Sequence, residues 1–594
     1  MSFNQTQSPT IDALLAEMTL MEKIGQMTQV EKNSISPEEV REYAIGSVLS
    51  GGGGNPTPNN PENWAAMVHE FQAAALETRL RIPIIYGSDA VHGHSNVVGA
   101  VIFPHNVGLG AARNPELVEK IGRITAIEML ATGVHWAFAP ALAVPQDIRW
   151  GRIYEGYGQN TALVTELGIA CLRGLQSVEA NNNRVLTCPK HFVADGGAMW
   201  GTTKYLPWLS ASNWQAATPN FKIDQGDAQL EEATLREVHL RPYEAAVAAG
   251  ALNIMVSLSS WNGVKLHQHQ YLLTDVLKTE LGFEGFLVSD WGAIDQLDED
   301  YYTCVVRAIN AGLDMAMVPM DYRRYIEAVA KSVENGDIPE SRVDDAVRRI
   351  LHAKFAVGLF DNPWGDPSLL PLVGCEAHRE VARDAVRQSL VLLKNENNLL
   401  PLDKNMASIL IAGRGANDIG LQCGGWSIEW QGLPGEITTG KTIFQGIRRI
   451  ASDTTEIALS ENGEMAFDEP VDVGIVVLAE TPYAEGLGDL ADLTLPADDI
   501  ALLERVRKQC RKMVVILLAG RPRIITEQLP MMDALIAAWL PGSEGDAIAE
   551  VLFGDYSFIG KLPYAFPRNV EQVPVSALEA SAEAPLFEFG FGLT

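Results

Sequence analysis

Asp290 is the carboxylate whose setting in the sequence most directly suggests catalysis. It follows the apolar run Phe286-Leu-Val288 and precedes Trp291, so a buried strand is predicted to end by presenting a carboxylate beside an indole. Reactive side chains collect at the carboxyl ends of strands in parallel α/β proteins. A buried carboxylate costs free energy unless it is paired, so Asp290 needs a reason to be there. The alternative is a helix N-cap, with a helix that starts near Trp291.

The elements that would position Asp290 form a repeating pattern over about 340 residues. Short apolar runs ending in polar or glycine residues occur at 45–50, 82–89, 136–140, 185–191, 252–257, 286–290 and 313–318. Segments with helical periodicity occur at 11–27, 62–79, 115–132, 160–176 and 230–249. Seven such strands predict an α/β fold, a (β/α)8 TIM-like barrel with one strand not recognised. A doubly wound sheet is the competing fold, but it usually needs fewer strands.

If the barrel prediction is correct, polar side chains at the strand ends converge on one face. The candidates are Asp89, Arg152, Lys190, His191, Met255, Asp290 and Met317. Charged hydrogen-bonding groups beside an aromatic ring suit a polyhydroxylated ligand. Taken singly, Arg152 could be a surface residue and His191 a core histidine.

A second domain is predicted after a break in the periodicity. Residues 361–375 contain three prolines and are interpreted as a linker that follows a barrel domain over 1–360. A helix at about 376–395 and apolar strands at 409–413, 473–479, 514–519 and 534–539 predict an α/β sandwich domain over 376–563. The tail 564–594 is predicted to pack back on the body.

Composition excludes several classes of function. The net charge of −30 opposes binding to nucleic acids and anionic membranes, while neutral or cationic ligands remain open. No leader or bilayer-spanning run is evident, so a cytoplasmic location is expected unless a leader has been removed. The six cysteines form no CxxC pair, which argues against a disulfide framework or a zinc site. The glycines of 413–420 have the wrong spacing for dinucleotide binding, and no cofactor is predicted.

Four motifs resemble those of glycoside hydrolase family 3, in particular its cereal exo-β-glucanases and related bacterial β-glucosidases. They are Lys190-His-Phe-Val-Ala-Asp-Gly-Gly197, Val288-Ser-Asp-Trp291, Ser389-Leu-Val-Leu-Leu-Lys-Asn395 and Trp539-Leu-Pro-Gly-Ser-Glu-Gly545. The resemblance runs nearly end to end. It implies a barrel followed by an α/β sandwich, with the active site between them, and a retaining mechanism with Asp290 as nucleophile. The matching segment 476–489 contains Glu480 and Glu485; the family's acid/base follows the tyrosine, which indicates Glu485.

The resemblance also implies binding roles. Asp89, Arg152, Lys190, His191, Met255 and Met317 would line the subsite for the non-reducing glucose. Trp291 and Trp430 would hold the next sugar between two aromatic faces, although Trp430 could instead be a buried core indole. Three positions depart from the cereal pattern, namely Gln296, Leu258 and Gly292, and segment 200–214 adds three tryptophans. Linkage preference is therefore not transferred.

The sequence predicts a retaining exo-acting β-glucosidase or exo-β-glucanase that acts on β-glucosides and β-gluco-oligosaccharides. One alternative is a β-xylosidase or broad-specificity β-glycosidase that uses the same two acids. The other is a non-catalytic carbohydrate-binding protein, which the presence of both carboxylates disfavours. The sequence does not predict an oligomeric state.

Overall fold

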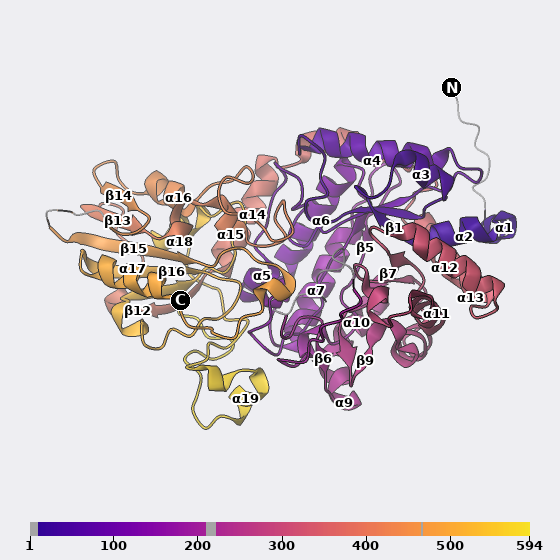
Figure 1. The fold of residues 1–594 in the computed structure, drawn as a ribbon. Coiled ribbons are helices and arrows are strands. Elements are labelled where there is room, and N and C mark those ends of the chain that lie inside the picture. The colour runs from indigo at the N-terminus through magenta and orange to yellow at the C-terminus, as the bar shows by residue number, and fades with distance from the viewer. Residues whose placement is uncertain (1–9, 210–220, 465–466, 468) are drawn as a thin grey trace. The chain divides into compact units, whose positions relative to one another are not determined.

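The computed structural model describes residues 10–209, 221–464, 467 and 469–594 (Figure 1). The nine N-terminal residues, where no leader was recognised, and Trp214 lie outside the described residues. The chain forms two compact units, each built from separate segments. The barrel unit comprises 1–90, 122–142 and 171–373, and the sandwich unit comprises 91–121, 143–170 and 374–594.

Within the described part of the barrel unit, eight parallel strands form the predicted barrel. They are β1 (Thr28–Glu31), β2 (Ser47–Ser50), β3 (Ile85–Ser88), β4 (Trp136–Ala137), β5 (Leu186–Thr187), β7 (Asn253–Met255), β10 (Phe286–Val288) and β11 (Ala316–Met317). Six follow the order β11-β1-β2-β3-β4-β5, and β7 pairs with β10. Parallel bridges Phe192–Val256 and Val288–Met315 join these two sheets, so the barrel closes. A small separate sheet contains β6 (Asp227–Ala228), β8 (Ser260–Trp261) and β9 (Val264–Lys265).

The strand missing from the sequence pattern is β1, and the prediction of one helix over 11–27 was wrong. The structure has α1 (Ile11–Glu17) and α2 (Leu20–Gln26). Thr19 is the N-cap of α2 and forms a capping box with Glu22. A new helix therefore begins there, although the apolar residues before and after it have similar spacing. The side chains of strand β1 are mostly polar, yet all four residues are buried. Within the barrel, Thr28 donates to the Ile24 carbonyl oxygen and Gln29 donates to Ser47.

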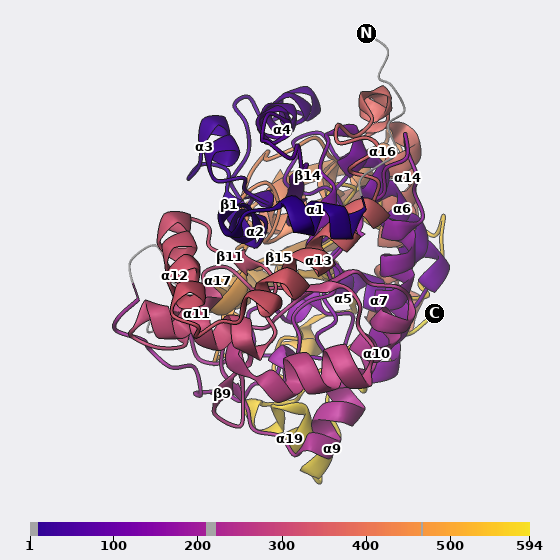
Figure 2. The same cartoon turned by 90° about the vertical axis from the view of Figure 1, so that its right-hand side faces the viewer.

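The helices lie outside the barrel strands (Figure 2). Those with bounds near the predicted ones are α4 (Pro61–Leu76), α6 (Pro115–Ala131), α7 (Thr161–Gln176) and the run of α9 (Glu232–Thr234), a π-helical turn (Leu235–Leu240) and α10 (Arg241–Ala248). The barrel unit also contains α3 (Pro37–Glu42), α11 (Tyr301–Ala311), α12 (Tyr322–Glu334) and α13 (Glu340–Ala356).

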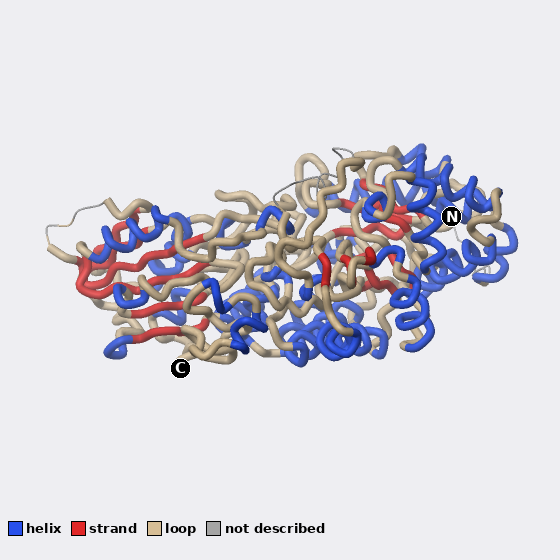
Figure 3. Tube along the Cα trace, turned by 60° about the horizontal axis from the view of Figure 1, so that its bottom comes forward, coloured by secondary structure: helices blue, strands red, loops and turns tan. Residues whose placement is uncertain are grey.

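The sandwich unit contains one mostly parallel sheet, as predicted (Figure 3). Its order is β12 (Val391–Asn395), β17 (Ala534–Ala537), β16 (Cys510–Leu518), β15 (Val471–Ala479), β13 (Ser408–Ala412) and β14 (Glu456–Ser460), and only the β12–β17 pair is antiparallel. Alternate residues of β15 enter two buried clusters: Val476 and Leu478 join one, Ile475 and Val477 the other. The sheet is therefore covered on both faces, which requires nearly continuous apolar strands.

The helix predicted over 376–395 is too long. Helix α14 (Glu376–Ser389) ends first, and residues 391–395 form β12, whose first three residues are buried against β17. Strand β14, which the sequence did not reveal, is only partly buried at the sheet edge, so it lacks an apolar signature. The other helices are α5 (Asn106–Ala112), α15 (Ile419–Cys423), α16 (Ile443–Ile450), α17 (Ala497–Arg507), α18 (Ala547–Leu552) and α19 (Val575–Ala580).

The C-terminal tail contacts strand β12. The Leu593 N–H donates to the Leu392 carbonyl oxygen at 2.9 Å.

Among the residues described, no helix combines the length and the apolar character that crossing a bilayer requires. All six cysteines are free thiols, and four of them are buried.

Candidate active site

Asp290 lies just beyond β10 and is 8% exposed. The Trp291 backbone N–H donates to its Oδ1 at 2.7 Å, and the Asp290 N–H donates to His267 Nε2 at 3.2 Å. Burial lowers the pKa of His267 to about 3, so its ring is neutral and can accept that hydrogen bond. The N-cap alternative is wrong, because the next helical turn starts at Ala293 and Gly292 precedes it as its cap.

His191 approaches Asp290 from the loop after β5. Its Nε2 lies 3.7 Å from Asp290 Oδ2, which is too far for a hydrogen bond. Its Nδ1 lies 2.9 Å from Asp195 Oδ2, and the Gly196 N–H donates to the other oxygen of Asp195. Because a carboxylate accepts, this contact assigns the ring proton to Nδ1 and turns Nε2 toward Asp290. All three of these side chains are buried.

The remaining barrel candidates lie at the ends of other barrel strands. Lys190 Nζ lies 3.1 Å from Asp89 Oδ1, and both side chains are largely buried. Met255 on β7 is the register partner of Val288. Met317 on β11 donates its backbone N–H to Ser289 Oγ at 2.8 Å. The structure therefore places these predicted residues at or just beyond the ends of four other strands of the same barrel.

Trp291 leaves β10 beside Gly51, where an added Cβ would lie 3.0 Å from the indole. Its side chain is only partly buried. Gly51 thus allows the indole to approach the backbone closely while part of the ring remains accessible.

Glu485 and Arg152 both belong to the sandwich unit. Glu485 is 5% exposed, opens the 3-10 turn Glu485–Gly488 and has a φ of 55°. A non-glycine residue in this left-handed region is uncommon, and such strain clusters at functional sites. Arg152 Nη1 lies 3.2 Å from Glu485 Oε1. Two further hydrogen bonds of 2.9 Å join the same guanidinium to Glu155, so Arg152 is shared between two carboxylates.

Glu480, the other acid/base candidate, is held in a different way. Its carboxylate accepts hydrogen bonds from the Gly520 N–H at 2.9 Å, Tyr483 Oη at 3.0 Å and Arg523 Nη1 at 2.8 Å. These partners come from two loops and fix both carboxylate oxygens. The contacts indicate a structural role for Glu480.

The two tryptophans of segment 423–432 differ in burial. Trp426 is 6% exposed, and its indole N–H donates to Glu155 Oε1 at 3.0 Å. Trp430 is partly buried, and its carbonyl oxygen accepts from the Trp426 N–H. Of these two tryptophans, the buried core indole is therefore Trp426.

Four residues with direct contacts to the candidates were not predicted, namely Glu155, Asp195, His267 and Trp426. Asp195 stands four residues after His191 within a motif already singled out, and Glu155 stands three residues after Arg152. That spacing is a usable signal for both. His267 is 23 residues from Asp290, so nothing local indicates it, whereas Trp426 stands four residues before Trp430, to whose carbonyl oxygen its N–H donates. Within the described ranges, no group of three or more His, Cys, Asp or Glu residues is arranged to hold a metal ion.

Comparisons with known proteins agree on one family. The glycosyl hydrolase family 3 N terminal domain matches residues 19–212 and 220–353, and the glycosyl hydrolase family 3 C-terminal domain matches residues 390–594. A crystal structure of a single-residue variant of an exo-1,3/1,4-beta-glucanase from a Pseudoalteromonas species is 39% identical. Its TM-score is 0.89, and the match covers 98% of this chain and 94% of that one.

Two curated relatives carry different substrate names. A lysosomal beta glucosidase of Dictyostelium discoideum is 34% identical over 100% of this chain and 76% of its own length. A beta-xylosidase of Formosa agariphila is 31% identical over 88% of this chain and 76% of its own length.

Proposed function

Because this chain belongs to glycosyl hydrolase family 3, we propose that it is a retaining β-glucosidase or exo-β-glucanase that removes glucose from non-reducing ends. The observation that carries the proposal is the buried carboxylate of Asp290 at a barrel strand end, with His191 oriented beside it by Asp195. The names of the Pseudoalteromonas and Dictyostelium relatives support the choice of glucose.

The proposed reaction has two steps. Asp290 attacks the anomeric carbon and forms a covalent glycosyl ester, while Glu485 gives its proton to the departing glycosidic oxygen. Glu485 then takes a proton from water, whose oxygen attacks the same carbon, releases glucose and regenerates the Asp290 carboxylate. Two inversions at one carbon retain the β configuration.

Asp89, Lys190 and Arg152 are the charged side chains proposed to bind sugar hydroxyls. Asp89 and Lys190 form a largely buried ion pair, so each can make a charge-assisted hydrogen bond to a sugar hydroxyl without large rearrangement. Arg152 is fixed by Glu155 and can do the same. Met255 and Met317 supply apolar contacts, and Trp291 and Trp430 are proposed to stack on the next sugar.

Trapping with a 2-fluoroglucoside tests sugar, mechanism and nucleophile together. The 2-fluorine slows both steps, and an activated leaving group keeps the first step faster than the second, so the glycosyl ester should accumulate, and peptide mapping should find it on Asp290. A label on another carboxylate would overturn the assignment of the nucleophile. Slow turnover without any covalent label would count against retention.

The second candidate function is a β-xylosidase, which the relative from Formosa agariphila favours. Comparing kcat/KM for an aryl β-glucoside and the matching aryl β-xyloside separates the two. We expect the glucoside to be preferred by about tenfold or more, because a site that hydrogen-bonds the C6 hydroxyl loses that bond with xylose. Equal or higher kcat/KM on the xyloside would make the xylosidase the better description. The cytoplasmic location stays a prediction, and the Dictyostelium relative is named lysosomal.

A further inference from the structure

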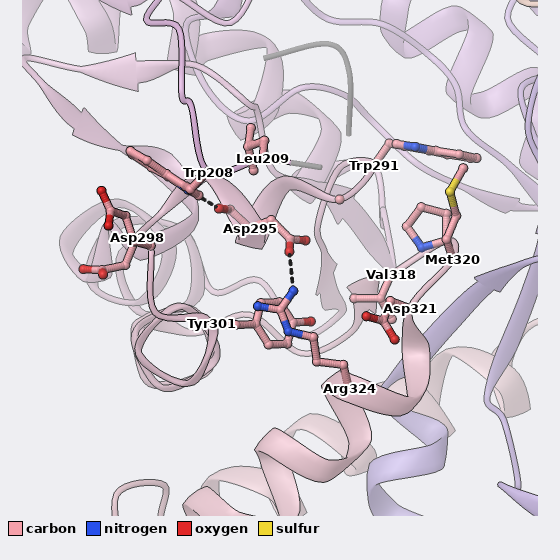
Figure 4. Close-up of a pocket in the computed structure, with 13 residues that line it drawn as sticks. Trp208, Leu209, Trp291, Asp295, Asp298, Tyr301, Val318, Met320, Asp321 and Arg324 are labelled. Carbon is pink, nitrogen blue, oxygen red and sulfur yellow. Dashed lines mark hydrogen bonds and ion pairs between the residues drawn. The ribbon is translucent and has the colours of Figure 1, made fainter. Parts of the chain in front are cut away.

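A pocket of about 190 Å³ lies beside Trp291 in the barrel unit (Figure 4). Its lining residues are Trp208, Leu209, Trp291, Gly292, Asp295, Asp298, Glu299, Tyr301, Val318, Pro319, Met320, Asp321 and Arg324. None of the residues assigned above to the glucose subsite lines it. Trp291 is the link, because it follows the proposed nucleophile directly and also forms one wall of the pocket.

Trp208 supplies an aromatic face that is already fixed in place. The residue is 38% exposed, and its Nε1 donates to the Asp295 carbonyl oxygen at 3.1 Å. Figure 4 shows Trp208 and Trp291 at opposite sides of the pocket, with the side chain of Met320 below the Trp291 ring. An exposed indole held by a hydrogen bond offers a large contact area at small entropic cost, because its orientation is set before binding.

The polar lining is mainly acidic. Asp295, Asp298, Glu299 and Asp321 contribute carboxylates, and Arg324 contributes the one cation among the lining residues described. Arg324 lies over the Tyr301 ring at 3.7 Å, and its Nη1 is 3.6 Å from Asp295 Oδ1. Excess negative charge repels anionic ligands such as uronates and phosphates. Carboxylates accept hydrogen bonds from hydroxyl groups, and an aromatic face packs against the C–H face of a sugar ring.

We propose that this pocket binds a further glucosyl unit of the substrate, beyond the sugar that stacks on Trp291. The inference rests on the proposed function and adds a preference for trisaccharides and longer chains over disaccharides. The volume is smaller than the roughly 300–1,000 Å³ of pockets that bury drug-sized ligands, and it suits one sugar ring. A purely apolar leaving group would fit less well, because it would cover carboxylates without giving them hydrogen-bond donors.

The test compares laminaritriose with laminaribiose in the wild type and in Trp208→Ala. Laminaribiose has no unit beyond the Trp291 sugar, so it is the internal reference. We expect the ratio of kcat/KM for the two sugars to favour the trisaccharide in the wild type and to fall about tenfold in Trp208→Ala. Trp208→Phe keeps an aromatic face but loses the hydrogen bond to Asp295, so its ratio should lie between the two.

Trp364→Ala is the matched control. Trp364 is also 38% exposed in the barrel unit, but it stacks on His69 with ring centres 4.4 Å apart. The same loss of an exposed indole there should leave the ratio as in the wild type. A ratio that is unchanged in Trp208→Ala, or that falls equally in Trp364→Ala, would overturn the proposal. Failure of the wild type to cleave either sugar or an aryl β-glucoside would instead overturn the proposed function.

Discussion

The loops after β10 and β15 have the same arrangement of acids but hold them differently. Each has a carboxylate next to the strand end and a second one five residues later: Asp290 and Asp295 in the first loop, Glu480 and Glu485 in the second. After β15 the first acid is fixed by Arg523, Tyr483 and Gly520. The second acid of each loop also lies near an arginine, Asp295 near Arg324 and Glu485 near Arg152, so the two loops differ in how the first acid is held.

We infer from this comparison that a carboxylate near a strand end is only a candidate for catalysis and that its hydrogen-bond partners decide its role. A carboxylate that accepts three hydrogen bonds, one of them from an arginine, serves structure, because moving it would leave buried donors unpaired. Asp290 contacts a backbone N–H and the edge of a histidine, which suits a nucleophile that must reach a sugar. The predictions below test this difference, from the largest expected effect to the smallest.

Replacing the acid next to β10 should have the largest effect. Asp290→Asn should lower kcat/KM on an aryl β-glucoside by at least about 10³-fold, because the amide cannot form the glycosyl ester. The thermal midpoint should stay near that of the wild type, since the substitution keeps the shape of the side chain. Near-normal turnover by a verified Asp290→Asn sample would reject Asp290 as nucleophile.

Replacing each of the two acids after β15 by alanine should have different effects on turnover and on stability. Glu485→Ala should lose about 10²–10⁴-fold on substrates with poor leaving groups, which need a proton, and should lose less on activated ones. Azide should restore part of its turnover by replacing the water that the base activates.

Glu480→Ala is the control for this pair. It leaves Arg523 and Tyr483 without their carboxylate, so the free energy of unfolding should fall by about 1–3 kcal/mol, and azide should not help. If azide rescued Glu480→Ala and not Glu485→Ala, the two roles would have to be exchanged.

The orientation of His191 should matter less than either of the two proposed catalytic carboxylates. In Asp195→Asn the side-chain amide can donate to Nδ1 as well as accept from it. The contact then no longer fixes which ring nitrogen of His191 carries the proton. We expect kcat/KM to fall about tenfold, with most of the loss in kcat and little change in the thermal midpoint. A variant with unchanged kinetics would show that Asp195 does not position His191.

The smallest effect should come from the second acid after β10. Burial raises the pKa of Asp295 from 3.8 to about 6, which outweighs the opposing charge of Arg324. Between about pH 4 and pH 6 the folded state therefore holds a proton that the unfolded state has lost. The stability contributed by this group is present at low pH and is lost as the pH rises through about 6.

Asp295→Asn removes that titration. The free energy of unfolding of the variant minus that of the wild type should increase by about 1 kcal/mol from pH 5 to pH 8, because only the wild type loses this contribution. Urea unfolding at both pH values measures this change. A stability difference that is independent of pH would show that Asp295 titrates normally and that this loop lacks the predicted asymmetry.

The sequence by itself determined the two α/β folds and the position of Asp290. Strands buried on both faces must be nearly continuous apolar runs, so seven barrel strands and four sandwich strands were visible without a structure. Strand β1 was not recognised because its side chains are mostly polar and are nevertheless buried inside the barrel, where Gln29 donates to Ser47, a partner that no local pattern records. Strand β12 was not recognised in the sequence because its apolar residues continue the periodicity of α14.

Only the tertiary structure decided which groups act on each candidate. The choice of Glu485 over Glu480 rests in the sequence on resemblance alone. In the structure it gains a physical reason, because Gly520 and Arg523 reach Glu480 from a loop about 40 residues away. The pocket between Trp208 and Trp291 is likewise made by segments about 80 residues apart. Local periodicity predicts which residues are buried. Hydrogen-bond partners depend on which distant loops meet, and only the folded chain determines this.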